Sequence, residues 1–155
     1  MEEHNEFVRV PIQMGLTFNY TAGRYFTYFF NQLKENGKIM ATRCSKCGMV
    51  FLPPRSFCGE CHQTMDDWVE VGPGGVLVGF TSIYFSVYDG SIGRTRPSPF
   101  GAGLIKLDGA DTALNHYLNE SDIGKLRMGQ RVRAVFKEER EGNIGDILYF
   151  NVLDD

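Results

Sequence analysis

All four cysteines of this 155-residue chain lie in one short segment, as two Cys-x-x-Cys pairs separated by residues 48–57. Paired thiolates at such spacing are typical ligands of a tetrahedral zinc ion, because the backbone within each pair can fold around the metal. Gly48 follows the first pair and Gly59 lies inside the second, where a tight turn needs backbone freedom. The sequence therefore predicts one structural Zn²⁺ site with four ligands: Cys44, Cys47, Cys58 and Cys61.

The same four thiolates are compatible with one other metal. Iron in a rubredoxin-like site has the same tetrahedral geometry, so the choice between zinc and iron stays open. A thioredoxin-type redox pair is not expected, because neither Cys-x-x-Cys begins a helix in a β-α-β pattern. With all four thiolates bound to a metal, no cysteine remains as a nucleophile, and acyl transfer by a cysteine of this chain alone is excluded.

A run of basic residues without a single acidic residue surrounds the first cysteine pair. Its members are Lys38, Arg43, Lys46 and Arg55. They could compensate the negative charge of a zinc ion bound by four thiolates. They could equally bind the phosphates of a nucleotide or of coenzyme A, since charge-assisted hydrogen bonds to phosphate are strong. Both interpretations remain open at this point.

Two further arginines, Arg94 and Arg96, lie in the longest loop of the β-rich second half. Loops of small barrels are common ligand sites, which favours a functional role for this pair. The candidate residues for binding coenzyme A phosphates are accordingly Lys46, Arg55, Arg94 and Arg96.

Composition and charge restrict the class of protein. With 43% hydrophobic and 23% charged residues, the chain has the composition of a globular domain that can bury one core. A net charge of −3 gives no general attraction to nucleic acid or to anionic membranes. The acidic amino terminus does not resemble a secretory signal, and no apolar run approaches the ~20 residues of a membrane span. We expect a cytoplasmic protein.

Aromatic residues recur at helical spacing near the amino terminus and predict an amphipathic helix at about residues 22–36. Thr21 or Asn19 could cap its start, and Gly37 follows its last turn. The aromatic face is either buried in its own domain or docks on a partner. The candidate docking residues are Tyr25, Phe26, Phe29 and Phe30.

The rest of the chain is predicted to be β-structure. Short strands are expected at 38–42, 49–52 and 68–71, and five longer ones at 76–84, 100–107, 112–118, 131–136 and 147–152. A helical turn at 121–126 lies between the third and fourth long strands, which is the element order of an OB-fold. A tight turn at 141–143 is expected before the last strand.

The predicted fold class is mainly β with an N-terminal helix, in which a rubredoxin-like zinc ribbon precedes a five-stranded OB-fold barrel. The predicted segments are an arm (1–18), the helix (19–37), the ribbon (38–70) and the OB-fold (71–155).

Other chemistry-bearing residues form no recognisable motif. His4, His62 and His116 are scattered, and no Ser-His-Asp or paired-carboxylate pattern occurs. The aromatic group Tyr84, Phe85 and Tyr88 either belongs to the barrel core or forms a platform for stacking bases.

Several of these features together resemble the family named domain of unknown function thirty-five, small zinc-ribbon/OB-fold proteins associated with thiolases and other acyl-CoA enzymes. The resemblance covers about residues 20–152. It rests on Tyr25-Phe26-x-x-Phe29, Cys44-x-x-Cys47-Gly48, Pro53-Pro54-Arg55, Cys58-x-x-Cys61, Trp68 and Leu126-x-x-Gly129-x-x-Val132.

The resemblance implies a non-catalytic accessory subunit that binds a thiolase-fold catalytic subunit and helps to form its acyl-CoA site. It also invites comparison with a thiolase complex of aromatic-compound degradation. Two alternatives remain open: a nucleic-acid-binding module, and an acyl-CoA-binding protein without an enzyme partner.

Overall fold

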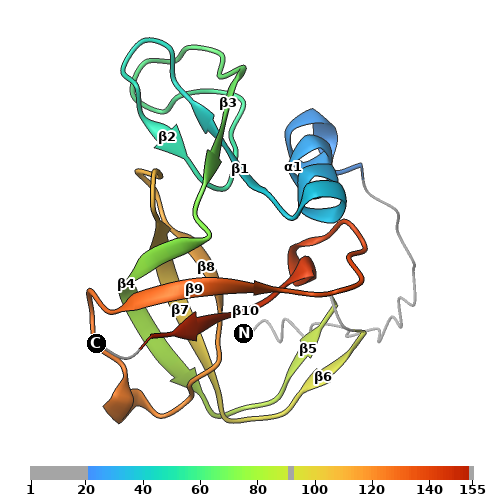
Figure 1. Cartoon of the computed structure of the whole chain (residues 1–155), viewed down its shortest axis with the longest axis vertical. Helices are drawn as coiled ribbons and strands as arrows, with labels where there is room; N and C mark the ends of the chain where they lie inside the picture. The colour runs from blue at the N-terminus through green and yellow to red at the C-terminus, as the bar shows by residue number, and fades with distance from the viewer. Residues whose placement is uncertain (1–20, 91–92, 154–155) are drawn as a thin grey trace, which may run out of the picture.

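The computed structural model describes residues 21–90 and 93–153. The predicted arm at 1–18, the alternative cap Asn19 and His4 lie outside the described residues. Figure 1 shows three parts: a helix, a small ribbon domain at the top and a barrel below. No helix within the described ranges is both long enough and apolar enough to cross a bilayer.

The helix α1 runs from Gly23 to Asn36, close to its predicted bounds. Its N-cap is Ala22 and not the predicted Thr21. The Oγ1 of Thr21 still accepts a hydrogen bond from the N–H of Gly23, the first helical residue, at 3.2 Å. Gly37 ends it in a left-handed conformation with φ of 63°, which favours glycine.

The ribbon is a three-stranded antiparallel sheet in the order β2-β1-β3. Its strands are β1 (Ile39–Arg43), β2 (Val50–Phe51) and β3 (Asp67–Val71). The first cysteine pair lies in the turn between β1 and β2, and the second lies in the longer connection between β2 and β3. Both predicted knuckles are therefore held by one small sheet.

Five strands close into a barrel in the order β10-β8-β7-β4-β9, which confirms the predicted OB-fold. They are β4 (Gly74–Ile83), β7 (Phe100–Leu107), β8 (Leu114–Leu118), β9 (Arg131–Phe136) and β10 (Ile147–Val152). The short 3-10 helix η1 (Ile123–Lys125) connects β8 to β9 where a helical turn was predicted.

The connection between β9 and β10 is longer than the predicted tight turn at 141–143. It contains the 3-10 helix η2 (Ile144–Asp146). Asp146 is fully buried, and its carboxylate accepts hydrogen bonds from the backbone N–H groups of Glu141 and Gly142, each at 2.8 Å. A buried carboxylate satisfied by backbone donors thus organises this connection.

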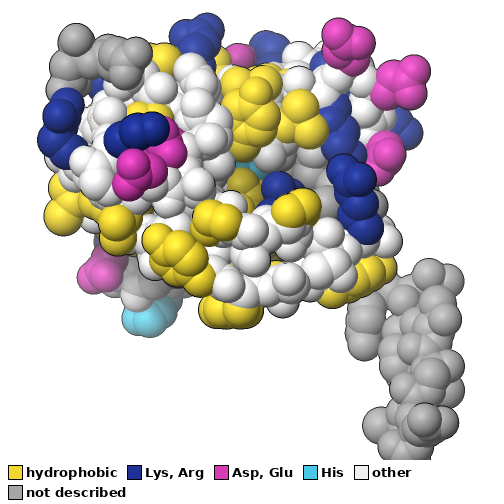
Figure 2. Space-filling model, turned by 90° about the horizontal axis from the view of Figure 1, so that it is seen from below, with side chains coloured by type: hydrophobic (Ala, Val, Ile, Leu, Met, Phe, Trp, Pro, Cys, Tyr) yellow, Lys and Arg dark blue, Asp and Glu magenta, His cyan; other side chains and the backbone are white. Residues whose placement is uncertain are grey.

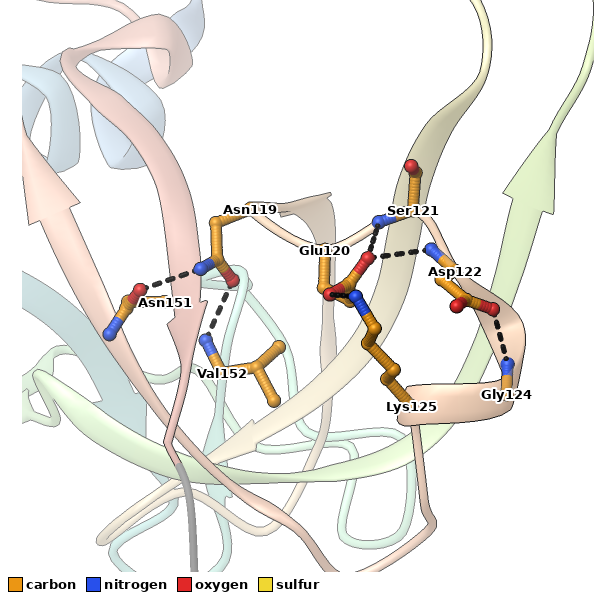
Figure 3. Close-up of polar contacts among 8 residues, drawn as sticks. All are labelled: Asn119, Glu120, Ser121, Asp122, Gly124, Lys125, Asn151 and Val152. Carbon is orange, nitrogen blue, oxygen red and sulfur yellow. Dashed lines mark hydrogen bonds and ion pairs between the residues drawn. The ribbon is translucent and has the colours of Figure 1, made fainter.

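The barrel closes where β10 runs parallel to β8, and only one residue pair, Phe150 with Leu118, is in register there. The side chain of Asn119 extends this contact, as Figure 3 shows. Its Nδ2 donates to Asn151 Oδ1 at 2.7 Å, and its Oδ1 accepts from the N–H of Val152 at 2.8 Å. The side chain of Asn119 therefore extends a short backbone pairing, in which its own N–H donates to the Phe150 carbonyl at 3.1 Å.

The next residues hold η1 in place (Figure 3). Glu120 accepts hydrogen bonds from the N–H groups of Ser121 and Asp122 at 2.9 and 2.7 Å and pairs with Lys125 at 3.3 Å. The pKa of Glu120 is lowered chiefly by the Asp122 backbone N–H.

Between β4 and β7 the chain forms a hairpin that the sequence analysis missed. Its strands β5 (Val87–Asp89) and β6 (Arg94–Arg96) are short and antiparallel, and residues 91–92 between them are not described. The region was expected to be a loop because three-residue strands carry too little alternation to be recognised.

One continuous hydrophobic core joins the three parts, since it includes Phe29 and Leu33 of α1, Ile39 of β1, and Leu77 and Phe150 of the barrel. A second, smaller cluster surrounds the cysteines and contains Phe51 and Met65. The ribbon therefore has little apolar core of its own and depends on another source of stability.

Candidate metal centre and ligand sites

The four cysteine side chains converge on one point. Their Sγ atoms all lie within 4.8 Å of one another, and Cys47 Sγ lies 3.7 Å from Cys58 Sγ. A tetrahedron with Zn–S bonds of about 2.3 Å has edges of about 3.8 Å, so the donor set fits a single zinc ion. Cys44 and Cys58 are buried, whereas Cys47 is exposed and Cys61 is half-buried. The predicted ligand set is thus brought together, and the ribbon is a site for one structural zinc ion.

The two knuckles have the same backbone hydrogen bond. The carbonyl of Cys44 accepts from the N–H of Gly48 at 2.8 Å, and the carbonyl of Cys58 accepts from the N–H of His62 at 3.0 Å. Both donor residues are left-handed, with φ of 78° and 54°. The prediction that Gly59 supplies the freedom of the second knuckle is wrong, because His62 occupies the equivalent position.

Two of the thiols differ in how readily they ionise. The backbone N–H of Cys47 lowers the pKa of Cys44 to about 7. Hydrogen bonding with the Cys47 sulfur raises the pKa of Cys61 to about 12. The Cys44 thiolate therefore forms readily, whereas Cys61 resists ionisation because its hydrogen bonds to the other sulfurs and its burial favour the neutral thiol. A divalent ion provides the charge that lets all four bind as thiolates.

The four predicted phosphate-binding residues do not form one site. Lys46 and Arg55 are exposed on the ribbon, and the Arg55 guanidinium lies 5.4 Å from the centre of the Phe51 ring. Arg94 and Arg96 lie on β6, at the opposite end of the molecule (Figure 1). The reason is the fold itself: the ribbon and the β5-β6 hairpin project from opposite ends of the barrel.

Lys38, which also belongs to the basic run, does not balance the charge of the metal centre. Lys38 forms an ion pair with Glu70 at 2.8 Å, so this charge is balanced on β3 rather than at the metal.

A groove of about 440 Å³ runs between the start of α1 and the ribbon. Its lining combines basic and aromatic side chains: Arg24, Tyr25, Phe26, Arg55 and Phe57. Phe57 is 59% exposed although it is next to the buried ligand Cys58. The groove thus joins Arg55 of the predicted phosphate set with Tyr25 and Phe26 of the predicted docking set.

Sequence reasoning did not select Arg24 or Phe57. Arg24 pairs with Asp66 of the ribbon at 2.9 Å, and the hydroxyl of Tyr25 donates to the same carboxylate at 3.1 Å. One feature of the sequence pointed to Phe57: it is next to the metal ligand Cys58, where a large apolar side chain is free to point toward solvent.

The aromatic face of α1 is divided between the core and the surface. Phe29 is 1% exposed and packs in the core of this chain, so the prediction that it docks on a partner is wrong. Phe26 is exposed and Phe30 is half-buried, and docking stays a prediction for both. Tyr25 and Tyr28 pack against Trp68 of β3 with tilted rings, whose centres lie 5.6 and 4.4 Å from that of Trp68.

The aromatic group after β4 is not part of the barrel core. Tyr84, Phe85 and Tyr88 are 71%, 68% and 68% exposed, which rules out the core interpretation. A role in stacking remains available to them.

A second cavity, the barrel pocket, has a volume of about 510 Å³ and lies between the barrel and the β5-β6 hairpin. Arg94, Arg96 and His116 line it together with a largely apolar wall. Figure 2 looks onto the lower face of the molecule and shows a hollow bordered by hydrophobic side chains, with basic and histidine side chains inside it. His62, by contrast, is exposed on the ribbon, so the two described histidines share no site.

Comparison with known proteins agrees with this architecture. Residues 32–66 match the family model described as the ChsH2 rubredoxin-like zinc ribbon domain, and residues 68–137 match the ChsH2 C-terminal OB-fold domain. A DUF35 domain-containing scaffold protein of Methanocaldococcus jannaschii is 21% identical over 122 residues, which cover 77% of this chain and 83% of that protein.

Two solved structures share the fold. A Sulfolobus solfataricus protein of unknown function from the DUF35 family has a TM-score of 0.57 and 25% identity, covering 84% of this chain and 86% of that one. A chain of the Ltp2-ChsH2(DUF35) aldolase has a TM-score of 0.62 and 20% identity, covering 86% of this chain and 98% of that one. With its ribbon, its barrel and these matches, the chain belongs to the DUF35 family of zinc-ribbon and OB-fold proteins.

Proposed function

We propose that this chain is a non-catalytic accessory subunit of a thiolase-type acyl-CoA enzyme. The observation that carries the proposal is the groove between α1 and the ribbon, which places Arg55 and Arg24 beside exposed aromatic side chains. Aromatic residues and arginine are the residue types that contribute most to protein interfaces. The relatives support the proposal, since one is described as a scaffold protein and another is part of an aldolase complex.

The metal centre explains why the chain would need a catalytic partner. Zinc would hold all four thiolates, so no cysteine of this chain is free to accept an acyl group. The ion instead fixes the shape of the ribbon, and with it the position of Phe57 and Arg55 at the groove. The chemistry would then come from the catalytic subunit, and this chain would shape part of its surface.

In the finer form of the proposal, the groove helps to hold coenzyme A where the two subunits meet. Arg55 and Arg24 of its lining would face the phosphates, because arginine binds phosphate through two parallel hydrogen bonds. Lys46 is exposed on the ribbon outside the groove lining, and its role as a point charge for phosphate stays a prediction. Arg94 and Arg96 would not take part in that site, given their position at the other end of the molecule. We propose further that the chain works in the cytoplasm, where thiols stay reduced. The specific assignment we propose is the small subunit of benzoylsuccinyl-CoA thiolase.

Co-expression with a thiolase-type enzyme from the same organism tests the proposal. We expect one complex on size-exclusion chromatography with light scattering, and acyl transfer only in samples that contain the enzyme. Phe57→Ser should weaken the complex about tenfold or more, since it removes an exposed aromatic anchor. Phe85→Ser is the matched control, because Phe85 is similarly exposed but lies outside the groove. Two separate species, or equal effects of both variants, would contradict the proposal.

A second candidate function, single-stranded nucleic-acid binding, is supported by the exposure of Tyr84, Phe85 and Tyr88. It predicts that an oligonucleotide titration at low salt saturates and that affinity falls steeply as salt rises. The net charge of −3 argues against it.

The third alternative, an acyl-CoA-binding protein without a partner, predicts saturable coenzyme A binding by the isolated chain. Absence of saturation in both titrations, together with a stable enzyme complex, would leave the accessory subunit as the function.

A further inference from the structure

The barrel pocket contains an arginine whose position is fixed by its neighbours. Arg96 donates from Nη2 and Nε to the same carboxylate oxygen of Asp89, at 2.6 and 3.2 Å. Its guanidinium carbon lies 3.7 Å from the centre of the Tyr117 ring, a cation–π contact. Asp89 is 7% exposed, so this pair lies in a partly desolvated environment.

Arg96 retains the capacity to bind a ligand. A guanidinium has five N–H groups, and Asp89 takes two of them. The remaining three have no hydrogen-bond partner among the described residues, and the side chain is 23% exposed where it lines the pocket. Asp89 and the Tyr117 ring hold the planar guanidinium in place, so it is already oriented to accept a second planar anion.

The charge of the barrel pocket limits the ligand to a monoanion. Among the described lining residues, Arg94 and Arg96 are positive and Asp89 is negative, which leaves one net positive charge. His116 adds none at neutral pH, because burial lowers its pKa. One net positive charge matches a carboxylate and falls short of the several negative charges of a nucleotide diphosphate.

The wall of the barrel pocket provides an apolar surface for the rest of a ligand. It is formed by Ile83, Val87, Phe100, Ile144, Ile147 and Leu148. A volume of about 510 Å³ lies within the range of about 300–1,000 Å³ that is typical of small-molecule sites. Apolar walls with a few convergent polar groups are the usual composition of such sites.

We propose that the barrel pocket binds a small organic monocarboxylate, with its carboxylate on Arg96 and Arg94 and its apolar body against the pocket wall. The site is built by the barrel and the β5-β6 hairpin, away from the groove between α1 and the ribbon. It therefore does not rest on the proposed function, and either can fail without the other.

Titration of the full chain followed by two-dimensional amide NMR tests the proposal. The probe is phenylacetate, with phenylacetamide as a neutral ligand of the same shape and inorganic phosphate as an anion without an apolar body. We expect phenylacetate to saturate one site and to shift the signals of Arg94, Arg96 and Tyr117. The amide and phosphate should bind at least tenfold more weakly, because each lacks one of the two features that the pocket recognises.

Variants distinguish the specific role of the two arginines from a general effect of positive charge. Arg94→Gln should weaken phenylacetate binding about fivefold, whereas Arg133→Gln, an exposed arginine of β9 outside the pocket, should leave it unchanged. Because Arg96→Gln alone would remove an ion-pair partner of the buried Asp89 carboxylate, the double variant Asp89→Asn/Arg96→Gln is used. It should fold but lose the preference for acid over amide. Equal affinities for acid and amide, signal shifts elsewhere in the chain, or no saturation at millimolar phenylacetate would overturn the proposal.

Discussion

The carboxylate of Asp111 accepts a hydrogen bond from the backbone N–H of Val50 at 2.8 Å, and the N–H of Asp111 donates back to the Val50 carbonyl at 2.9 Å. The neighbouring Thr112 hydroxyl makes a similar pair of contacts with the backbone of Leu52, both at 2.8 Å. These four hydrogen bonds connect β2 of the ribbon, and Leu52 directly after it, to the loop between β7 and β8 of the barrel. The ribbon that holds the metal centre is therefore tied to the barrel by backbone and side-chain hydrogen bonds.

Removing the Asp111 side chain should loosen this connection. We expect Asp111→Ala to lower the free energy of unfolding by about 1–2 kcal/mol, because it leaves a partly buried N–H of β2 without its acceptor. Hydrogen exchange of the Val50 amide should become faster as well. Glu60→Ala, an exposed carboxylate elsewhere on the ribbon, is the control and should change neither quantity. Equal stabilities of the two variants would contradict the proposed connection.

Loss of one metal ligand should unfold the ribbon. Zinc binding in small modules contributes roughly 10–16 kcal/mol, and the ribbon has only a small apolar cluster beyond it. We expect Cys58→Ser to lose zinc and solubility together, as measured by metal analysis and by the yield of soluble protein. Ser45→Ala, beside a ligand but not one itself, should retain one zinc per chain. If Cys58→Ser kept one zinc per chain, the ligands would be wrongly assigned.

The side chain of Asn119 should stabilise the closure of the barrel. Asn119→Ala removes two hydrogen bonds to β10 and should cost about 1–2 kcal/mol in denaturant unfolding. Asn151→Ala removes only the bond between the two side chains and should cost about half as much. The reverse order of the two losses would show that Asn119 does not bridge the strands.

Burial of His116 should make stability depend on pH. The folded pKa of His116 is lowered, chiefly by desolvation, from an unfolded value of about 6.5. The unfolded chain therefore binds the proton more readily, so the contribution is fully present above pH ~6.5 and is lost as the pH falls toward the folded pKa. His116→Phe should flatten this part of the unfolding profile.

The exposed His62 provides the control for that pH profile. His62→Asn should keep the wild-type pH dependence, since asparagine tolerates the left-handed conformation with φ of 54° at that position. A wild-type profile in His116→Phe would show that another group titrates in this range.

The elements that hold the site follow closely from the sequence. The aromatic spacing in α1, the alternation in the long barrel strands and the turn residues between them are local patterns, and local patterns set helix and strand position. The metal ligands could be identified for the same reason, because their spacing alone determines that the four sulfurs meet.

Other features depend on distant parts of the chain and could not be read from local sequence. The burial of Phe29 but not of Phe26 depends on which side of α1 faces the barrel. The helical spacing of aromatic residues includes both positions, so it does not tell them apart. The groove forms where Arg55 and Phe57 of the ribbon meet the first turn of α1, about thirty residues earlier in the chain. No local sequence pattern predicts a contact between residues so far apart. The β5-β6 hairpin is held by the Asp89–Arg96 pair, which is a property of the folded state.

The state of the thiols in the native protein tests the central claim most directly, namely that one metal ion takes all four cysteines and leaves this chain as a scaffold. We predict one zinc ion per folded chain by metal analysis and no thiol that reacts with a titrating reagent until the protein is unfolded in the presence of a chelator, when all four react. A folded, metal-free chain with titratable thiols would contradict the claim.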